Sequence, residues 1–94
     1  MRIRQATLAD LDTLVHFQQQ MALETEQLHL EPAILRKGIT ALITDAHKGV
    51  YYVAEEEAEL LACLSLTYEW SDWRNGTVWW IQSVYVDQAH RGRA

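Results

Sequence analysis

The spacing of apolar residues changes at Gly49 from the period of a helix to the period of a strand. Before this glycine, Leu35, Ile39 and Leu42 recur every three or four residues, which places them on one face of a helix. After it, apolar side chains tend to alternate with others, as in strands that bury one face. The sequence therefore predicts helices in the first half and a sheet in the second, which is a mixed α/β fold.

The first half of the chain is expected to form one short strand and then two helices. The first six residues alternate between polar and apolar side chains, which is typical of a strand. A helix is expected over about 8–26, since Thr7 and Asp10 have the spacing of a capping box. A second helix is expected to begin at Pro32, which the first turn of a helix tolerates, and to end by Gly49.

Three strands are expected in the second half, over residues 50–54, 60–69 and 77–87. An acidic turn separates the first two strands, and a segment with an Asn-Gly pair separates the last two. The order of elements is then β-α-α-β-β-β, in a mostly antiparallel sheet with two helices. With 94 residues the chain has room for a single domain.

The strand expected at 77–87 is apolar on both faces, which is typical of a central strand covered on both sides. Aromatic side chains that alternate on a strand are more often core than binding site, so Trp79 and Trp80 are expected in the core. Trp70 and Trp73 fall in the preceding turn, where exposure is expected and a role in binding stays open. The alternation divides the strand into two sets of side chains, namely Val78, Trp80, Val84 and Val86 on one face and Trp79, Ile81 and Tyr85 on the other.

Composition and charge exclude several classes of protein. No apolar run approaches the ~18 residues that cross a bilayer, and the first residues carry no secretory signal, so a cytoplasmic protein is expected. The net charge is −5, from 13 acidic and 8 basic residues. This balance argues against nucleic acid or an anionic membrane as a partner.

Cysteine and histidine give no recognisable metal-binding pattern in the sequence. Cys63 is the single cysteine and cannot form an internal disulfide. The four histidines are scattered singly and lack the spacing of zinc ligands, so no metal site is expected.

The chain ends in an apolar strand, a short polar turn and the sequence Arg-Gly-Arg-Ala at 91–94. This ending resembles the start of the acyl-CoA-binding signature of the GNAT superfamily of N-acetyltransferases, Gln/Arg-x-x-Gly-x-Gly/Ala. The β-α-α-β-β-β order also resembles the first half of that fold, so the resemblance covers essentially the whole chain. Taken without the resemblance, so short a basic motif is better explained as a solvated tail.

The resemblance implies acetyl-CoA as a substrate, with direct attack of an amine on its thioester. Backbone N–H groups of a glycine-rich turn form an anion site, and the anion implied here is the pyrophosphate of the coenzyme. Arginine side chains would add charge-assisted contacts, and the strand would pair with the pantetheine arm through its main chain. The implied cofactor-binding residues are Val84, Tyr85, Val86, Arg91, Gly92, Arg93 and Ala94.

The family pattern is incomplete in this chain. Arg91 takes the Arg/Gln place and Ala94 takes the place of the first motif glycine, while the second small residue lies beyond 94. The resemblance therefore implies a truncated N-terminal part, which is expected to bind acetyl-CoA weakly and to be inactive alone. The acceptor amine stays open between a small molecule and a peptide.

The resemblance also implies a carboxylate or an ordered water near the last strand to deprotonate the amine. The candidate carboxylates are Glu69 and Glu24. The alternative for both is an ordinary solvated surface carboxylate.

A different class of function is also open, a non-catalytic dimerising module that has lost cofactor binding. A strand that is apolar on both faces, with no later strand to pair with its far edge, is a template for a second copy. A homodimer joined through 77–87 is therefore expected.

Overall fold

The computed structural model describes residues 1–91 and confirms the order β-α-α-β-β-β. The sheet has the order β1-β2-β3-β4, and every neighbouring pair is antiparallel. The elements are β1 (Arg2–Gln5), the 3-10 helix η1 (Leu8–Asp10), α1 (Leu11–Glu26), α2 (Pro32–Thr44), β2 (Gly49–Glu56), β3 (Glu59–Ser71), β4 (Gly76–Val86) and the 3-10 helix η2 (Gln88–His90).

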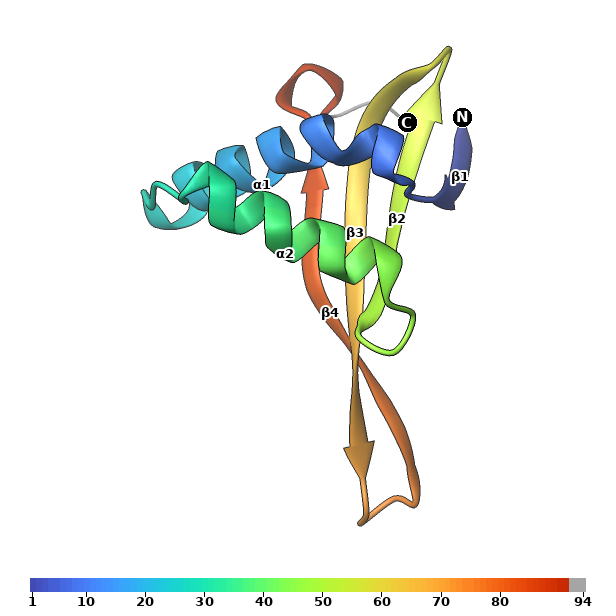
Figure 1. The fold of residues 1–94 in the computed structure, drawn as a ribbon. Coiled ribbons are helices and arrows are strands. Elements are labelled where there is room, and N and C mark those ends of the chain that lie inside the picture. The colour runs from blue at the N-terminus through green and yellow to red at the C-terminus, as the bar shows by residue number, and fades with distance from the viewer. Residues whose placement is uncertain (92–94) are drawn as a thin grey trace.

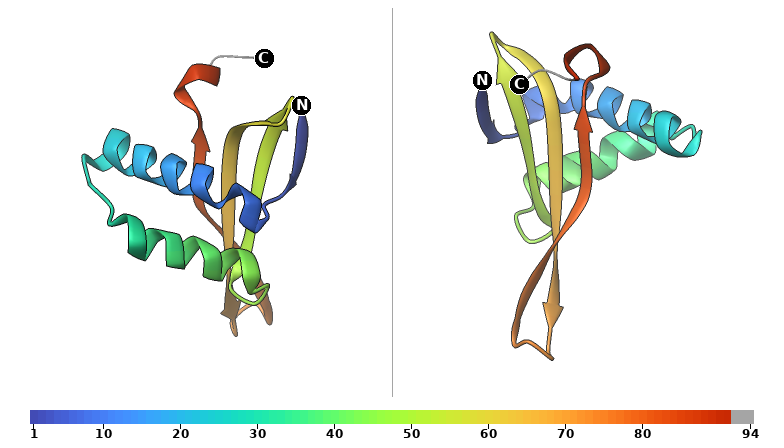
Figure 2. Two further views of the ribbon diagram at one scale, coloured as in Figure 1. Left: turned by 45° about the horizontal axis from the view of Figure 1, so that its top comes forward. Right: turned by 180° about the vertical axis from the view of Figure 1, so that it is seen from behind.

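Both helices lie on the same side of the sheet, and the hairpin formed by β3 and β4 continues well past them with a strong twist (Figures 1 and 2). No helix among residues 1–91 is long and apolar enough to span a bilayer. The core fills the space between the helices and the sheet. Its buried members are Leu11, Leu14, Val15, Phe17, Ile39, Tyr51, Val53, Cys63 and Tyr85.

An ion-pair network fixes the start of α1 against the sheet. The capping pair is present, since the Thr7 amide donates to the Asp10 carboxylate at 2.8 Å, although the first turn is a 3-10 turn. The Arg4 guanidinium of β1 donates two hydrogen bonds of 2.8 and 2.9 Å to the buried Asp10 carboxylate and a further one to Glu55 of β2. The hydrogen bonds from Arg4 lower the pKa of Asp10, because they stabilise its charged form.

The prediction that β4 follows one strict alternation is wrong, because the strand contains a β-bulge. Ser83 pairs with Ser65, whereas Ile81 pairs with Leu66, so Gln82 is an extra residue on β4. The extra residue shifts the alternation by one position, so the side chains before the bulge point to the opposite faces from those that strict alternation predicts. Ile81 therefore shares a face with Val84 rather than with Tyr85.

The expectation that β4 is covered on both sides is also wrong for the described residues. Its apolar side chains lie largely in solvent, with Trp79 59% exposed and Trp80 51% exposed, so neither tryptophan belongs to the core. The face of the sheet away from the helices is covered by no element within 1–91 (Figure 2). This face contains an apolar hollow of about 360 Å³. Trp73 is exposed in the β3–β4 turn, as expected. Trp70 is exposed too, but its expected place in the turn is wrong, because β3 continues to Ser71 and Trp70 pairs with Thr77.

Candidate functional site

The outer edge of β4 presents main-chain groups that no other described strand uses. The Asp87 amide donates to the Leu61 carbonyl at 2.8 Å, so the main-chain groups of Asp87 face β3. Alternate residues of a strand point their main-chain groups the same way, and the N–H and C=O groups of Tyr85 therefore face β3 as well. Val84 and Val86 consequently present their N–H and C=O groups at the outer edge of the sheet, where an extended ligand could pair with them.

Arg91 lies at this same edge, just after η2. Its Nε donates to the Val86 carbonyl at 2.9 Å, and its guanidinium lies 5.3 Å from the centre of the Tyr85 ring. It also forms an ion pair with Glu24, near the end of α1. The side chain is 42% exposed, so a bound anion could reach the guanidinium.

The structure brings Glu24 into one cluster with Tyr85 and Arg91. The Tyr85 hydroxyl donates to the Glu24 carboxylate at 2.9 Å. The hydrogen bond from Arg91, and secondly the one from Tyr85, lower the pKa of Glu24. A carboxylate with a lowered pKa is a weak proton acceptor, so these contacts favour a role in holding Arg91 over a role as general base.

Glu69 lies in a different part of the molecule, on the distal half of the β3–β4 hairpin. It is exposed, and its carboxylate accepts a hydrogen bond of 2.7 Å from the indole N–H of Trp80. Its strand partner, Val78, is seven residues from Tyr85 along β4, which corresponds to roughly 20 Å. Glu69 and Glu24 therefore do not act on the same atom. Glu69 borders a hollow of about 610 Å³ that Trp70 and Trp80 also line.

A buried polar line beneath β4 was not anticipated from the sequence. The Gln18 amide of α1 donates to the Ser83 hydroxyl at 2.9 Å, and Ser83 lies 2.7 Å from the Ser65 hydroxyl. Gln18 also contacts the Tyr51 hydroxyl. These bonds satisfy the polar groups that the helix-facing side of β4 carries, and they fix the strand against α1.

Cys63 is a buried structural residue. Its side chain is 3% exposed, and burial raises the pKa of its thiol to about 11. The thiol therefore remains protonated at neutral pH and is a poor nucleophile.

Gly92, Arg93 and Ala94, which the sequence assigns to the anion-binding turn, lie outside the described residues. Of the implied cofactor-binding residues, the structure places Val84, Val86 and Arg91 together at one edge. Tyr85 differs from these residues, because its main-chain groups face β3. Its side chain contacts Glu24 and Arg91.

Comparisons with known proteins show the family and the fold. The model of the acetyltransferase (GNAT) family matches residues 11–94. A possible acetyltransferase from Clostridium difficile 630 is 47% identical, with a TM-score of 0.93 over 98% of this chain and 60% of that one. No curated protein sequence gives a significant match.

Two more distant structures share the fold. A predicted acetyltransferase from Clostridium acetobutylicum, solved with acetyl-CoA, is 19% identical, with a TM-score of 0.74 over 98% of this chain and 63% of that chain. An aminoglycoside antibiotic 6'-N-acetyltransferase from Acinetobacter haemolyticus is 18% identical, with a TM-score of 0.70 over 98% and 61% of the two chains. This chain thus spans about 60% of the length of the structures that it resembles.

The family match covers most of the chain, and the order of elements and the position of Arg91 after β4 are consistent with it. The chain belongs to the GNAT family of acetyltransferases.

Proposed function

We propose that the chain provides the acetyl-CoA-binding edge of an N-acetyltransferase that transfers the acetyl group to an amine. The observation that carries this proposal is the placement of Arg91 beside the outward main-chain groups of Val84 and Val86. The chemistry of these groups matches that of the coenzyme. An edge strand suits the amides of a pantetheine arm, and an exposed guanidinium suits a pyrophosphate.

The two candidate bases take different roles in this proposal. Glu24 contacts Arg91, which we assign to the pyrophosphate, and the pantetheine arm separates the pyrophosphate from the thioester. A base must reach the attacking amine directly or through one water molecule. We therefore assign Glu24 to positioning Arg91, and we retain Glu69 as the candidate base for an amine bound beside Trp70 and Trp80.

A cytoplasmic location is part of the same proposal. The chain has one cysteine, and Cys63 is buried as a free thiol. Unpaired cysteines of this kind are usual in reducing compartments.

Residues 1–94 alone are expected to show no appreciable acetyltransferase turnover. Arg91 is the one cationic side chain that the described residues place beside the outer edge of β4 near Val86. Much of the rate of a direct acetyl transfer comes from positioning the thioester against the amine. A loosely held coenzyme is not positioned in this way, so the rate falls. A thiol-release assay with a panel of amines that includes aminoglycosides measures this, with the aminoglycoside 6'-N-acetyltransferase from Acinetobacter haemolyticus as the positive control. Robust, saturable thiol release by residues 1–94 would contradict the prediction.

The alternative function is a non-catalytic dimerising module, and one observation favours it. The outer edge of β4 pairs with no strand among residues 1–91, and Ile81 and Val84 beside it are 64% and 55% exposed. An unpaired apolar edge is a template for a second copy. Such pairing would occupy the main-chain groups that we assign to the coenzyme.

Without coenzyme, the chain is expected to form a homodimer through 77–87, and Ile81→Lys is expected to give a monomer. A lysine on the apolar face beside the edge would place a charge in the dimer contact, where its desolvation is costly. Leu8→Lys is the control, because Leu8 is 52% exposed and lies on η1, near the β1 side of the sheet. Light scattering at micromolar concentration reports the mass. A wild-type monomer, or a dimer that survives Ile81→Lys, would argue against this interface.

A further inference from the structure

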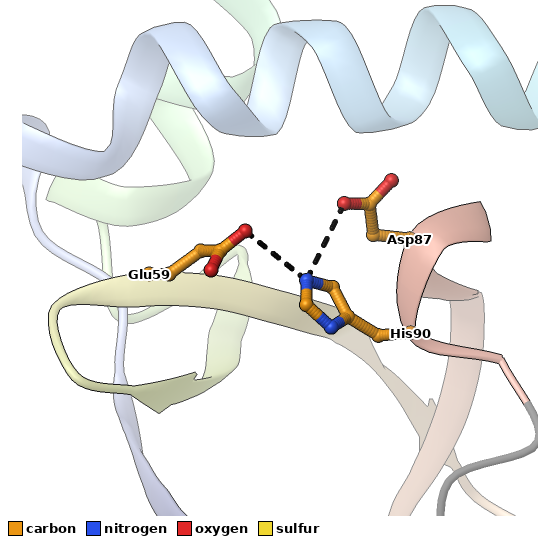
Figure 3. Close-up of side chains that lie close together, drawn as sticks. All are labelled: Glu59, Asp87 and His90. Carbon is orange, nitrogen blue, oxygen red and sulfur yellow. Dashed lines mark hydrogen bonds and ion pairs between the residues drawn. The ribbon is translucent and has the colours of Figure 1, made fainter.

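We infer that Glu59, Asp87 and His90 form a binding site for a divalent transition-metal ion. Their side chains converge from two elements, with Glu59 at the start of β3 and the other two residues at η2 (Figure 3). One potential ligand atom from each residue lies within 4.8 Å of the other two. The sequence alone gives no sign of this site, because Glu59 is separated from the other two residues by an entire hairpin.

The pairing of β3 with β4 brings these residues together. Ala62 pairs with Val86, and the Asp87 amide continues the ladder with a hydrogen bond to the Leu61 carbonyl. The start of β3 is thereby held beside the residues that follow β4. Glu59 and Asp87 consequently lie close together at the open end of the β3–β4 hairpin. The hydrogen bonds of the ladder hold the main chain there in position.

Two of the three ligands are preorganised by the η2 turn. The His90 amide donates to the Asp87 carbonyl at 2.8 Å, which closes a 3-10 turn. Side chains three residues apart eclipse each other in a 3-10 helix, so Asp87 and His90 project to the same side. The His90 side chain is 11% exposed, and that of Asp87 is 30% exposed.

The distances match a metal site that needs only small adjustments. The Nε2 atom of His90 lies 3.1 Å from Oε1 of Glu59 and 3.9 Å from Oδ2 of Asp87. Metal–ligand bonds of ~2.0–2.2 Å place adjacent ligand atoms about 3 to 3.5 Å apart. An ion could therefore lie between the three atoms after a small shift of Asp87 and a rotation of Glu59, whose side chain is 66% exposed.

The surroundings provide room for water ligands and a favourable charge. Glu59 and Asp87 line a hollow of about 440 Å³, which can hold the water molecules that complete the coordination. Arg4 also borders this hollow, but Asp10 and Glu55 both bind its guanidinium and offset its charge. The two ligand carboxylates then balance the charge of a divalent ion.

The donor set selects the class of ion. Imidazole nitrogen suits Zn²⁺ and other first-row transition metals, whereas Mg²⁺ prefers an octahedron of oxygen atoms. A bound ion would connect the β2–β3 turn to η2, and η2 leads directly into Arg91. The titration described below measures ion binding alone, so its outcome is distinguishable from that of the proposed acetyl transfer.

Calorimetric titration with Zn²⁺ alone, at neutral pH in a buffer that does not chelate metals, tests the inference. Wild-type protein is expected to bind one ion per chain, and Mg²⁺ at the same concentration is expected to give no binding heat. His90→Ala and Glu59→Gln are each expected to raise the dissociation constant for Zn²⁺ by at least ~10-fold. Glu59→Gln keeps the size of an exposed side chain, so it tests the site even where His90→Ala disturbs the fold.

The matched control is His29→Ala, which removes an exposed histidine from the segment between α1 and α2 and is expected to leave the affinity unchanged. Absence of saturable Zn²⁺ binding would overturn the inference. So would equal binding of Mg²⁺, or Zn²⁺ binding that Glu59→Gln leaves intact. In those cases the hydrogen bond between His90 and Glu59 is a structural contact.

Discussion

Replacing Gly49 with alanine is expected to destabilise the protein by about 2–4 kcal/mol. A Cβ atom at this position would lie 2.1 Å from the main-chain oxygen of Leu66 and 3.0 Å from the side chain of Leu42. The first contact involves main chain of the neighbouring strand, which cannot rotate away. Relief would therefore require β2 and β3 to separate where Gly49 pairs with Thr67.

The size of this effect follows from the size of the protein. Small domains have a free energy of unfolding near the lower end of 5–15 kcal/mol, so the loss would be a large fraction of the total. A change of 1 kcal/mol shifts the melting temperature of such a domain by ~4–8 °C. Thermal unfolding followed by circular dichroism should show a fall of roughly 10–30 °C for Gly49→Ala.

Gly38→Ala is the matched control, because it makes the same chemical change inside α2. A Cβ at Gly38 would have no atom within 4 Å, so no contact opposes it. The gain in helix propensity should raise the stability by about 0.5–1 kcal/mol. Equal stability of the Gly49→Ala variant and the wild type would show that the strands do not approach each other as described.

The second large effect concerns the affinity for acetyl-CoA, which Arg91→Ala is expected to lower about tenfold. The guanidinium supplies charge-assisted hydrogen bonds to the pyrophosphate in our proposal. Glu24→Gln should also weaken binding, by a smaller factor of up to about fivefold. The substitution removes the carboxylate that positions Arg91 through their ion pair.

Calorimetric titration with acetyl-CoA at low and high salt measures both effects. The binding should weaken as salt is added, because exposed charges are screened over ~10 Å at 0.1 M and ~3 Å at 1 M ionic strength. Glu26→Gln is the control, since it removes the same charge from the end of α1. An affinity that Arg91→Ala leaves unchanged, or that Glu24→Gln raises, would contradict the assigned roles.

The order of elements could be predicted from the sequence because apolar spacing reports local geometry. The capping pair of Thr7 and Asp10 marks the start of the first helix, and the helix ends at Glu26 as expected. The change of period at Gly49 marks the first residue of β2. Each of these signals depends on neighbours within a few residues, which the sequence displays directly.

The bulge in β4 could not be predicted in the same way. An extra residue at Gln82 is defined by the pairing of Ser83 with Ser65 and of Ile81 with Leu66, and no feature of β4 alone reveals it. The exposure of Trp79 and Trp80 was missed for a related reason. Apolar composition on both faces indicates that a strand can be covered, but it does not show which segment covers it.

The contacts between charged side chains could not be predicted from the sequence either. Glu24 is 67 residues from Arg91, so their contact depends on how α1 crosses the end of β4. On the basis of the family resemblance, the sequence suggests Glu24 as a candidate base and Arg91 as a candidate cofactor-binding residue. Their mutual ion pair, which changes the role of Glu24 from base to positioning residue in our proposal, emerges only from the fold.

The central claim is that the outer edge of β4 and Arg91 bind acetyl-CoA, and a nuclear magnetic resonance titration tests it most directly. Amide signals of ¹⁵N-labelled protein would be followed as acetyl-CoA is added. We predict saturable shifts at Val84, Val86 and Arg91, with no change at Trp73 on the distant hairpin turn. Shifts that are absent from β4, or that cluster at the hairpin turn instead, would contradict the account.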